Sequence, residues 1–293
     1  MASAPAEFVF GSIRVLGASL AGEETCIMLP ELNVAFDVGR APRDLLSIDH
    51  VFLSHGHMDH AAGIAYYFSQ REFVGNAPGN LYVPATLVQP IRRLLQTWAD
   101  IDGHEPPGNV QAAIPGQDIV VRRDLLVRPF GVNHPAPAGR HGQSPPYGLG
   151  FCVIEVRQKL KDEYQGLDGP ALVDIKRRGE EITRRVELPL VAYCGDTAPG
   201  PFLSLDFVRT AQVLLLECTF VEADHQDRAR AGAHMHVTYL RELVPTLRNE
   251  RILLTHLSRR TGLAEARELV RRELSPADAE RVSFLMEYRR KKR

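Results

Sequence analysis

The chain has 293 residues and a formal net charge of -1, with 44% hydrophobic and 24% charged residues. This composition is typical of a folded protein with a sizeable core, and it excludes a protein that binds nucleic acid through its overall charge. Neither a signal-peptide pattern nor an apolar run near the roughly 20 residues of a membrane helix is present. We therefore expect a cytoplasmic protein without a membrane anchor.

Four cysteines are spread along the chain: Cys26, Cys152, Cys194 and Cys218. No two of them are close enough in sequence to form a CxxC pair, and each lies among apolar residues. Free cysteine is one of the most buried residue types. These positions therefore predict reduced cysteines in the core.

The first half of the chain alternates short apolar segments with turns, which predicts mainly β-structure. The expected strands are residues 8–15, 25–29, 33–38, 51–53, 81–84, 119–121, 125–130 and 150–156. Helical spacing of apolar residues predicts helices over 61–70 and 86–100. A segment rich in Pro, Gly and Ala over 135–146 indicates a loop.

The second half continues in the same style. Its expected strands are residues 188–193, 213–216 and 252–255, and its expected helices are residues 237–247 and 263–274. Four apolar strands of the chain end in a histidine or a carboxylate: His55, Asp196, Glu217 and His256. Ligands converge at strand ends in layered α/β proteins. Two β-rich halves with helices outside predict one domain over 1–293, an α/β protein built as a four-layer αββα sandwich.

A charged, weakly periodic segment interrupts this pattern, and we interpret residues 157–187 as a short inserted basic arm. Its basic residues are Arg157, Lys159, Lys161, Lys176, Arg177, Arg178, Arg184 and Arg185. Lys159, Lys161, Arg177 and Arg178 are candidates for binding a polyanion backbone. An ordinary solvated charged face is the alternative. A basic run at 289–293 is expected to be a solubilising tail rather than a nucleic-acid contact.

Residues 55–60 read His-Gly-His-Met-Asp-His and place four candidate metal ligands within six residues. Zinc binds imidazole nitrogen and carboxylate oxygen at about 2 Å in a four- or five-coordinate shell. In an extended turn, His55 and His57 point the same way and can share one ion, while Asp59 and His60 turn towards a second. We therefore expect a two-metal site, with zinc or manganese as the ion.

Two ions need more ligands than this segment supplies. His134 follows a strand, Asp196 lies in a Gly-Asp-Thr turn at a strand end, and His256 ends another strand. Each of them alone is also explained as a capping polar residue. A carboxylate can bridge two metals, which makes Asp196 the natural shared ligand. Together with residues 55–60, these three complete a two-metal set.

Two adjacent metals activate a water molecule and stabilise charge on the attacked and leaving oxygens, which suits phosphodiester hydrolysis. The leaving oxygen also needs a proton, and either His234 or His236 is a candidate donor. Both face the same way if their segment is extended, and Glu217 is placed to orient one of them. Ordinary surface histidines are the alternative. Asp37, at the end of a strand, either holds the histidine-rich segment or caps a turn.

These residues together resemble ribonuclease Z, a family of metallo-β-lactamase-fold endonucleases that trim the 3′ ends of precursor transfer RNA. The resemblance covers about residues 11–260 and rests on Ser-His-Gly-His-Met-Asp-His at 54–60 with Gly63, Gly-Asp-Thr at 195–197, Glu-Cys-Thr-Phe at 217–220 and Leu-Thr-His at 254–256. Glu-Thr-Cys at 24–26 and Lys-Leu-Lys-Asp-Glu-Tyr at 159–164 resemble the short form found in plants.

The resemblance implies roles for the site residues. By resemblance, His55, His57 and His134 hold one zinc ion, Asp59, His60 and His256 hold the other, and Asp196 bridges them. Asp59 would also assist the nucleophilic water, while Glu217 and His234 would serve the leaving group. The resemblance further implies a precursor transfer RNA substrate, an arm that clamps the transfer RNA elbow, and a homodimer.

Two questions stay open at this point. The chain has Met-His after His234 where the family usually has Ser-Thr, so the proton donor is either His234 or His236. The chief alternative function is a phosphodiesterase or ester hydrolase that acts on a small substrate, and a non-catalytic RNA-binding protein is a third. A small-substrate enzyme does not need the basic arm, and a non-catalytic site would lack ligands. We therefore expect the endoribonuclease.

Overall fold

The first half of the chain forms a seven-stranded sheet in the computed structural model, which describes residues 5–134 and 148–288. The strands in sheet order are β1 (Ala6–Phe10), β2 (Ile13–Leu20), β3 (Glu24–Leu29), β4 (Val34–Phe36), β5 (His50–Phe52), β6 (Gly79–Pro84) and β7 (Gly108–Ala113). Strands β1 to β4 pair antiparallel, and β4 to β7 pair parallel. The carboxyl ends of β4 and β5 therefore meet at one edge, where Asp37 and residues 54–60 follow them.

The second half forms another seven-stranded sheet. Its strands in sheet order are β14 (Val282–Phe284), β13 (Arg251–Thr255), β12 (Val213–Glu217), β11 (Thr183–Tyr193), β10 (Leu149–Leu160), β9 (Leu125–Gly131) and β8 (Ile119–Arg122). Strands β11 to β14 pair parallel. Asp196, Glu217 and His256 consequently gather at the shared carboxyl edge of these strands.

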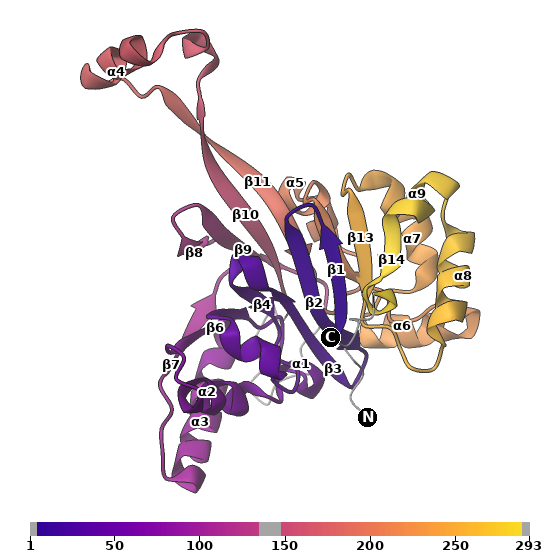
Figure 1. Ribbon diagram of the computed structural model, residues 1–293. Helices are drawn as coiled ribbons and strands as arrows, with labels where there is room; N and C mark the ends of the chain where they lie inside the picture. Colours follow the sequence, from indigo (N-terminus) through magenta and orange to yellow (C-terminus); the bar gives the residue numbers. More distant parts are fainter. Residues whose placement is uncertain (1–4, 135–147, 289–293) are drawn as a thin grey trace.

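Helices accompany each sheet on its outer side (Figure 1). The helices α1 (Met58–Ala61), α2 (Ile64–Phe73) and α3 (Val88–Asp102) belong to the first half, and α5 (Asp206–Arg209), α6 (Gln226–Gly232), α7 (Val237–Leu243), α8 (Leu263–Glu273) and α9 (Pro276–Arg281) to the second. Between the sheets, the rings of Phe36 and Phe151 lie 6.3 Å apart and those of Phe36 and Tyr193 lie 4.9 Å apart. The predicted four-layer αββα sandwich is therefore confirmed.

Several predicted element boundaries were wrong. The expected strand over 8–15 is split by a turn, because Gly11 has a φ of 57° and reverses the chain between β1 and β2. Strand β7 was not predicted, since its sequence, Gly-Asn-Val-Gln-Ala-Ala, has only two buried residues and lies at a sheet edge. Strand β14, which has three residues at the edge of the other sheet, was also missed.

Strands β10 and β11 continue together beyond the second sheet as a two-stranded ribbon. Their antiparallel pairing extends from Phe151 and Tyr193 to Leu160 and Thr183, well past the predicted strand end at residue 156. Helix α4 (Gly169–Arg177) lies at the tip, away from the two sheets (Figure 1). The side chain of Asp168 accepts a hydrogen bond from the backbone N of Ala171 at 3.0 Å and caps this helix. Residues 157–187 thus project from the sandwich.

Three other expectations have different outcomes. The cysteines are free and buried, as predicted. The expected loop over 135–146 and the expected tail at 289–293 lie outside the described residues. Within residues 5–134 and 148–288, no helix has the length and apolar character needed to cross a membrane.

Candidate metal centre

Residues 54–60 leave β5 as extended chain and then enter α1. His57 has an extended backbone with φ of -66° and ψ of 149°, and it precedes the first helical residue. His55 and His57 therefore face each other before the turn, with Nε2 and Nδ1 2.9 Å apart. Asp59 and His60 lie within the helix. The turn divides the four candidate ligands into two pairs.

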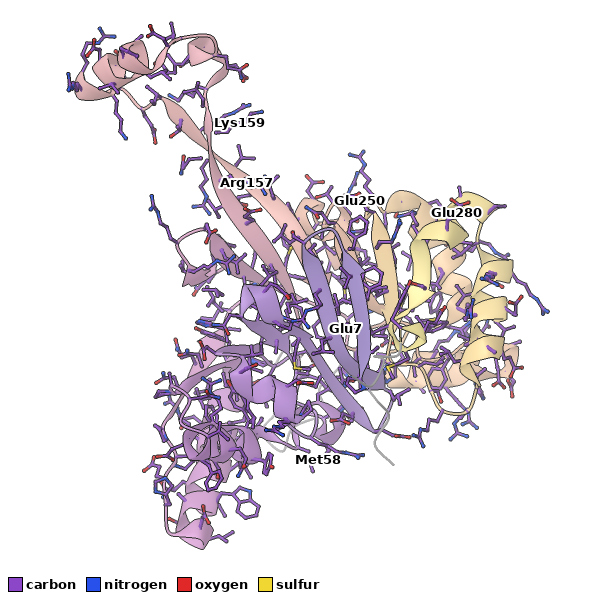
Figure 2. All side chains as sticks on the ribbon, viewed as in Figure 1. Glu7, Met58, Arg157, Lys159, Glu250 and Glu280 are labelled. Carbon is purple, nitrogen blue, oxygen red and sulfur yellow. The ribbon has the colours of Figure 1, made fainter. Side chains whose placement is uncertain are left out.

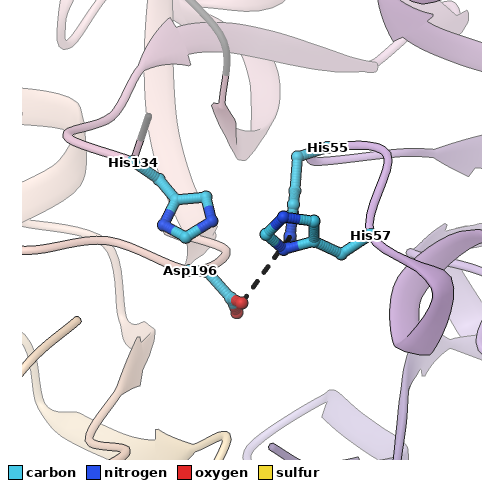
Figure 3. Close-up of side chains that lie close together, drawn as sticks. All are labelled: His55, His57, His134 and Asp196. Carbon is cyan, nitrogen blue, oxygen red and sulfur yellow. Dashed lines mark hydrogen bonds and ion pairs between the residues drawn. The ribbon is translucent and has the colours of Figure 1, made fainter. Parts of the chain in front are cut away.

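One candidate group combines both halves of the chain. Ligand atoms of His55, His57, His134 and Asp196 all lie within 4.8 Å of one another, and Figure 3 shows the four side chains around a common space. His134 Nε2 is buried and has no hydrogen-bond partner among the described residues. Leaving a buried polar atom unpaired is costly. A metal ion at this position would complete its coordination, so the residues fit the ion.

The second group is Asp59, His60 and His256, whose ligand atoms also lie within 4.8 Å of one another. Asp196 lies between the two groups. One of its oxygens is 3.4 Å from His60 Nε2, and the other is 3.3 Å from His256 Nε2 and 3.6 Å from His55 Nε2. This central position is the one that a shared carboxylate ligand requires.

Two left-handed backbone positions direct ligands into this space. Gly195 has a φ of 59° and turns the chain from β11 to Asp196. A Cβ at Gly195 would lie 2.9 Å from the Cβ of Ser54, so both the conformation and the close approach require glycine. His256 has a φ of 58°, and its backbone N donates a hydrogen bond to Ser19 Oγ at 2.9 Å.

Hydrogen bonds fix the ring orientation of three candidate ligands. Each contacts an oxygen through Nδ1: His60 contacts Asp37 at 2.8 Å, His55 contacts Ser54 at 3.0 Å and His256 contacts Thr219 at 2.9 Å. A histidine that donates its Nδ1 proton in this way presents an unprotonated Nε2 to a metal. Asp37 also accepts a hydrogen bond from the backbone N of Ser54. These contacts support its interpretation as the residue that holds the histidine-rich segment.

The electrostatics of the centre keep its carboxylates ionised and some imidazoles neutral. Burial opposes ionisation of Asp196, but neighbouring His256 and His60 outweigh burial and hold its pKa well below the ordinary value. Burial likewise opposes ionisation of Asp59, and the hydrogen bond from His256 lowers its pKa. Burial lowers the pKa of His55 well below the ordinary value. Ionised carboxylates and neutral imidazoles are the forms that bind zinc.

Glu217 and His234 lie beside the candidate metal ligands. Glu217 is fully buried, and its carboxylate accepts hydrogen bonds from the backbone N of Thr197, the backbone N and hydroxyl of Thr219, the backbone N of Met235 and Nδ1 of His234. The His234 ring stacks on His256 with centroids 5.4 Å apart. Burial opposes protonation of His234, but the Glu217 carboxylate at 2.8 Å outweighs it and raises the pKa of His234 to about 9.

His236 occupies a different environment. It is buried, Nε2 lies 2.9 Å from the carbonyl oxygen of Glu222, and Nδ1 accepts a hydrogen bond from the backbone N of Thr238 at the start of α7. Both ring nitrogens are therefore engaged within the fold. From the sequence, either histidine could be the proton donor. In the structure, only His234 of the two contacts Glu217, and His236 is hydrogen-bonded elsewhere.

The four candidate RNA-binding residues lie on the arm rather than at the metal centre. Lys159 is on the ribbon and exposed (Figure 2), and Lys161 follows it at the end of β10. Arg177 and Arg178 are exposed at the end of α4. They therefore lie apart from the candidate metal ligands.

Comparison with known proteins identifies the family. The profile of the metallo-beta-lactamase superfamily matches residues 28–139. The tRNase Z TRZ1 of Arabidopsis thaliana is 32% identical over 258 residues, which cover 87% of this chain and 88% of that protein. The chloroplastic tRNase Z TRZ2 of the same plant is 31% identical over 288 residues, which cover 95% of this chain and 77% of that protein. The chain belongs to the ribonuclease Z family.

Solved structures agree on the fold. The short form of human tRNase Z aligns with a TM-score of 0.57 at 16% identity, covering 83% of this chain and 91% of that chain. The metallo-beta-lactamase fold protein YhfI of Bacillus subtilis aligns with a TM-score of 0.59 at 15% identity, covering 88% and 91%. The metallo-β-lactamase fold expected for a ribonuclease Z relative is thus confirmed.

Sequence reasoning missed the residues that position the ligands in this ribonuclease Z family member. Ser54 and Thr219 lie within the motifs that carried the resemblance, yet neither was assigned a role. Tyr193 ends β11 and was treated only as a strand residue, although its hydroxyl donates to Asp37. One signal could have identified them: each has a polar side chain at or near the end of a strand, close in sequence to a candidate ligand.

Proposed function

We propose that this chain is a metal-dependent endoribonuclease that removes the 3′ trailer of precursor transfer RNA by phosphodiester hydrolysis. One observation carries the proposal: Asp196 lies between two candidate groups of metal ligands and can be shared by both. The chain that contains this arrangement belongs to the ribonuclease Z family. The printed names of its plant relatives describe tRNase Z proteins. The alternative small-substrate hydrolase has no need of the projecting arm.

The ligand assignment follows the two groups. His55, His57 and His134 would hold one zinc ion, Asp59, His60 and His256 would hold the other, and Asp196 would bridge them; manganese is the alternative metal. When bound, such a pair of ions activates water and stabilises charge on the reacting oxygens. The ligand side chains are already oriented by hydrogen bonds within the fold, which supports an assembled site rather than one formed by metal binding.

The remaining catalytic groups handle protons. The attacking water loses its proton to the Asp59 carboxylate as its oxygen forms a bond to phosphorus. The bond from phosphorus to the leaving oxygen then breaks, and that oxygen takes the Nε2 proton of His234. Glu217 holds His234 through Nδ1 at 2.8 Å, and its negative charge raises the pKa of His234 and so favours the protonated ring. Both ring nitrogens of His236 are engaged elsewhere, so His234 is the proposed general acid.

The arm, residues 157–187, is the proposed RNA-binding insertion in a single domain over 1–293. Its arginines pair with nearby carboxylates: Arg177 with Asp174 and Arg178 with Glu180. The three lysines that the described ranges contain, Lys159, Lys161 and Lys176, all lie in the arm, and no ion pair of theirs is present there. Unpaired ammonium groups can bind phosphates without first breaking an internal ion pair. Lys159 and Lys161 are therefore favoured over Arg177 and Arg178 as phosphate contacts.

A homodimer in the cytoplasm completes the proposal. Helix α3 presents an apolar stripe in which Leu94, Trp98 and Ile101 are 42%, 51% and 67% exposed. Exposed apolar surface of this kind is typical of a protein–protein contact. Light scattering of the wild type and of Trp98→Arg tests the dimer, and imaging of the tagged chain tests its location. A monomeric wild type would contradict the homodimer. Location of the tagged chain in an organelle would contradict the cytoplasmic assignment.

The decisive experiment is cleavage of a 3′-extended precursor transfer RNA by the purified protein. Asp59→Ala should abolish cleavage, whereas Asp206→Ala, an exposed aspartate on α5, should leave it unchanged. Hydrolysis of bis-nitrophenyl phosphate is measured in parallel. Turnover of this diester without cleavage of the RNA would replace the proposal with a small-substrate hydrolase.

A further inference from the structure

Asp37 is a buried carboxylate at the meeting point of the two sheets. Its oxygens accept hydrogen bonds from the backbone N of Ser54 at 2.7 Å, the hydroxyl of Ser54 at 2.9 Å and the hydroxyl of Tyr193 at 2.5 Å. His60 Nδ1 lies 2.8 Å away. Asp37 itself has a φ of 56°, a conformation that aspartate tolerates better than most residues. The side chain is therefore held from several directions.

Asp37 reaches two candidate ligands. It accepts the Nδ1 proton of His60 directly, which leaves Nε2 of that ring for a metal. It also accepts the hydroxyl proton of Ser54, so the Ser54 oxygen is free to accept the Nδ1 proton of His55 at 3.0 Å. The orientation of one carboxylate thus sets the orientation of an imidazole in each ligand group.

Tyr193 comes from the other sheet. It ends β11 three residues before Asp196, and its ring stacks on Phe36, the residue before Asp37, with centroids 4.9 Å apart. Burial raises the pKa of the Tyr193 phenol well above its ordinary value, so the hydroxyl remains a donor. The hydrogen bond from Tyr193 to Asp37 therefore joins the strand that leads to Asp196 to the residue that orients His55 and His60.

We propose that Tyr193 is a positioning residue of the metal centre. Its hydroxyl holds Asp37 in the orientation that presents Nε2 of His60 and His55 to the ions, and it fixes these histidines relative to Asp196. The inference rests on the metal ligands assigned under the proposed function. It predicts a specific loss of metal affinity when the hydroxyl is removed while the ring packing is kept.

The test is a zinc titration of the full chain against a chromophoric chelator, with Tyr193→Phe as the variant. Tyr67→Phe is the matched control, because Tyr67, on α2, is also fully buried. Its hydroxyl donates to the carbonyl oxygen of Ile48 at 2.7 Å rather than to a residue that holds a candidate ligand. We expect Tyr193→Phe to weaken zinc binding by about tenfold or more, and Tyr67→Phe to leave it unchanged. Melting temperatures of the metal-free proteins report the general cost of removing a buried hydroxyl.

Other outcomes are equally informative. A zinc affinity within about twofold of the wild type, or an equal loss in both tyrosine variants, would overturn the inference. If Tyr193→Phe does not fold, Ser54→Ala replaces it, because this change removes the other hydroxyl that holds Asp37; unchanged zinc affinity there would overturn the role of the Asp37 network. A wild type that binds no stoichiometric zinc would instead contradict the proposed metal centre itself.

Discussion

The candidate metal centre and the arm use charged side chains in opposite ways. In the centre, Asp37 and His60 are completely buried, and their contacts are fixed within the fold. In the arm, Arg177 and Asp174 are 78% and 67% exposed and lie 3.6 Å apart. Exposed pairs of this kind contribute only about 0–1 kcal/mol. Function should therefore depend on exact geometry in the centre and on the amount of charge in the arm.

After the complete loss expected for Asp59→Ala, the largest expected effect concerns two histidines that are near neighbours in sequence but differ in environment. Replacing the proposed proton donor by His234→Ala should lower the single-turnover rate of precursor cleavage by about 10²- to 10⁴-fold, the usual contribution of a general acid. His236→Ala should leave the rate near that of the wild type. It should lower the free energy of unfolding by about 1 kcal/mol, because it removes buried hydrogen bonds at the start of α7. Equal losses of cleavage rate in both variants would contradict the proposal that His234, and not His236, is the general acid.

A smaller but direct effect is the titration of His234. In chelator-treated protein, NMR should give a pKa of about 9 for His234, and Glu217→Gln should move it down towards the ordinary value of about 6.5. Because the folded-state pKa is the higher one, protonation stabilises the fold. This contribution is complete below about pH 6.5 and is lost as the pH rises through about 9. An unchanged pKa in Glu217→Gln would refute the role given to Glu217.

The smallest effect is expected in the arm. Lys159→Ala combined with Lys161→Ala should weaken precursor binding several-fold and make its logarithmic salt dependence shallower by about 1.5, because two phosphate contacts are lost. Arg177→Ala combined with Arg178→Ala should change the slope less, since both arginines already pair with carboxylates. Fluorescence anisotropy at several salt concentrations measures both slopes. A steeper loss in the arginine pair would reverse the assignment, and hydrolysis of bis-nitrophenyl phosphate should be unaffected in either.

The same contrast explains how much could be predicted from the sequence. The candidate ligands lie at strand ends or in the segment 55–60, and a strand end can be recognised from local apolar pattern alone. The layered fold followed from the same pattern. The sequence also suggested a hydrogen bond between Glu217 and one of two histidines, and the structure pairs Glu217 with His234.

What could not be predicted depends on contacts between distant segments. Tyr193 and Asp37 are separated by 156 positions, and only the packing of one sheet on the other brings them together. The distinction between His234 and His236 depends on Glu222 and Thr238, which no motif indicates. The charge of residues 157–187 predicted an arm, but its ribbon form was missed because none of the residues in the projecting parts of β10 and β11 is buried and apolar alternation is absent.

The length of the ribbon fixes how far the arm extends from the sandwich. Strand β11 extends from Thr183 in the arm to Tyr193 in the sandwich, an 11-residue span of about 36 Å at roughly 3.3 Å per residue, and Asp196 follows shortly after it. One extra residue in a strand turns the later side chains to the opposite face of the sheet unless a bulge absorbs it, and the pairing of β11 with β10 already shifts by one residue between Val191 and Pro189. Under the proposed function, the length of β11 would therefore set how far the tip of the arm stands from the candidate metal centre.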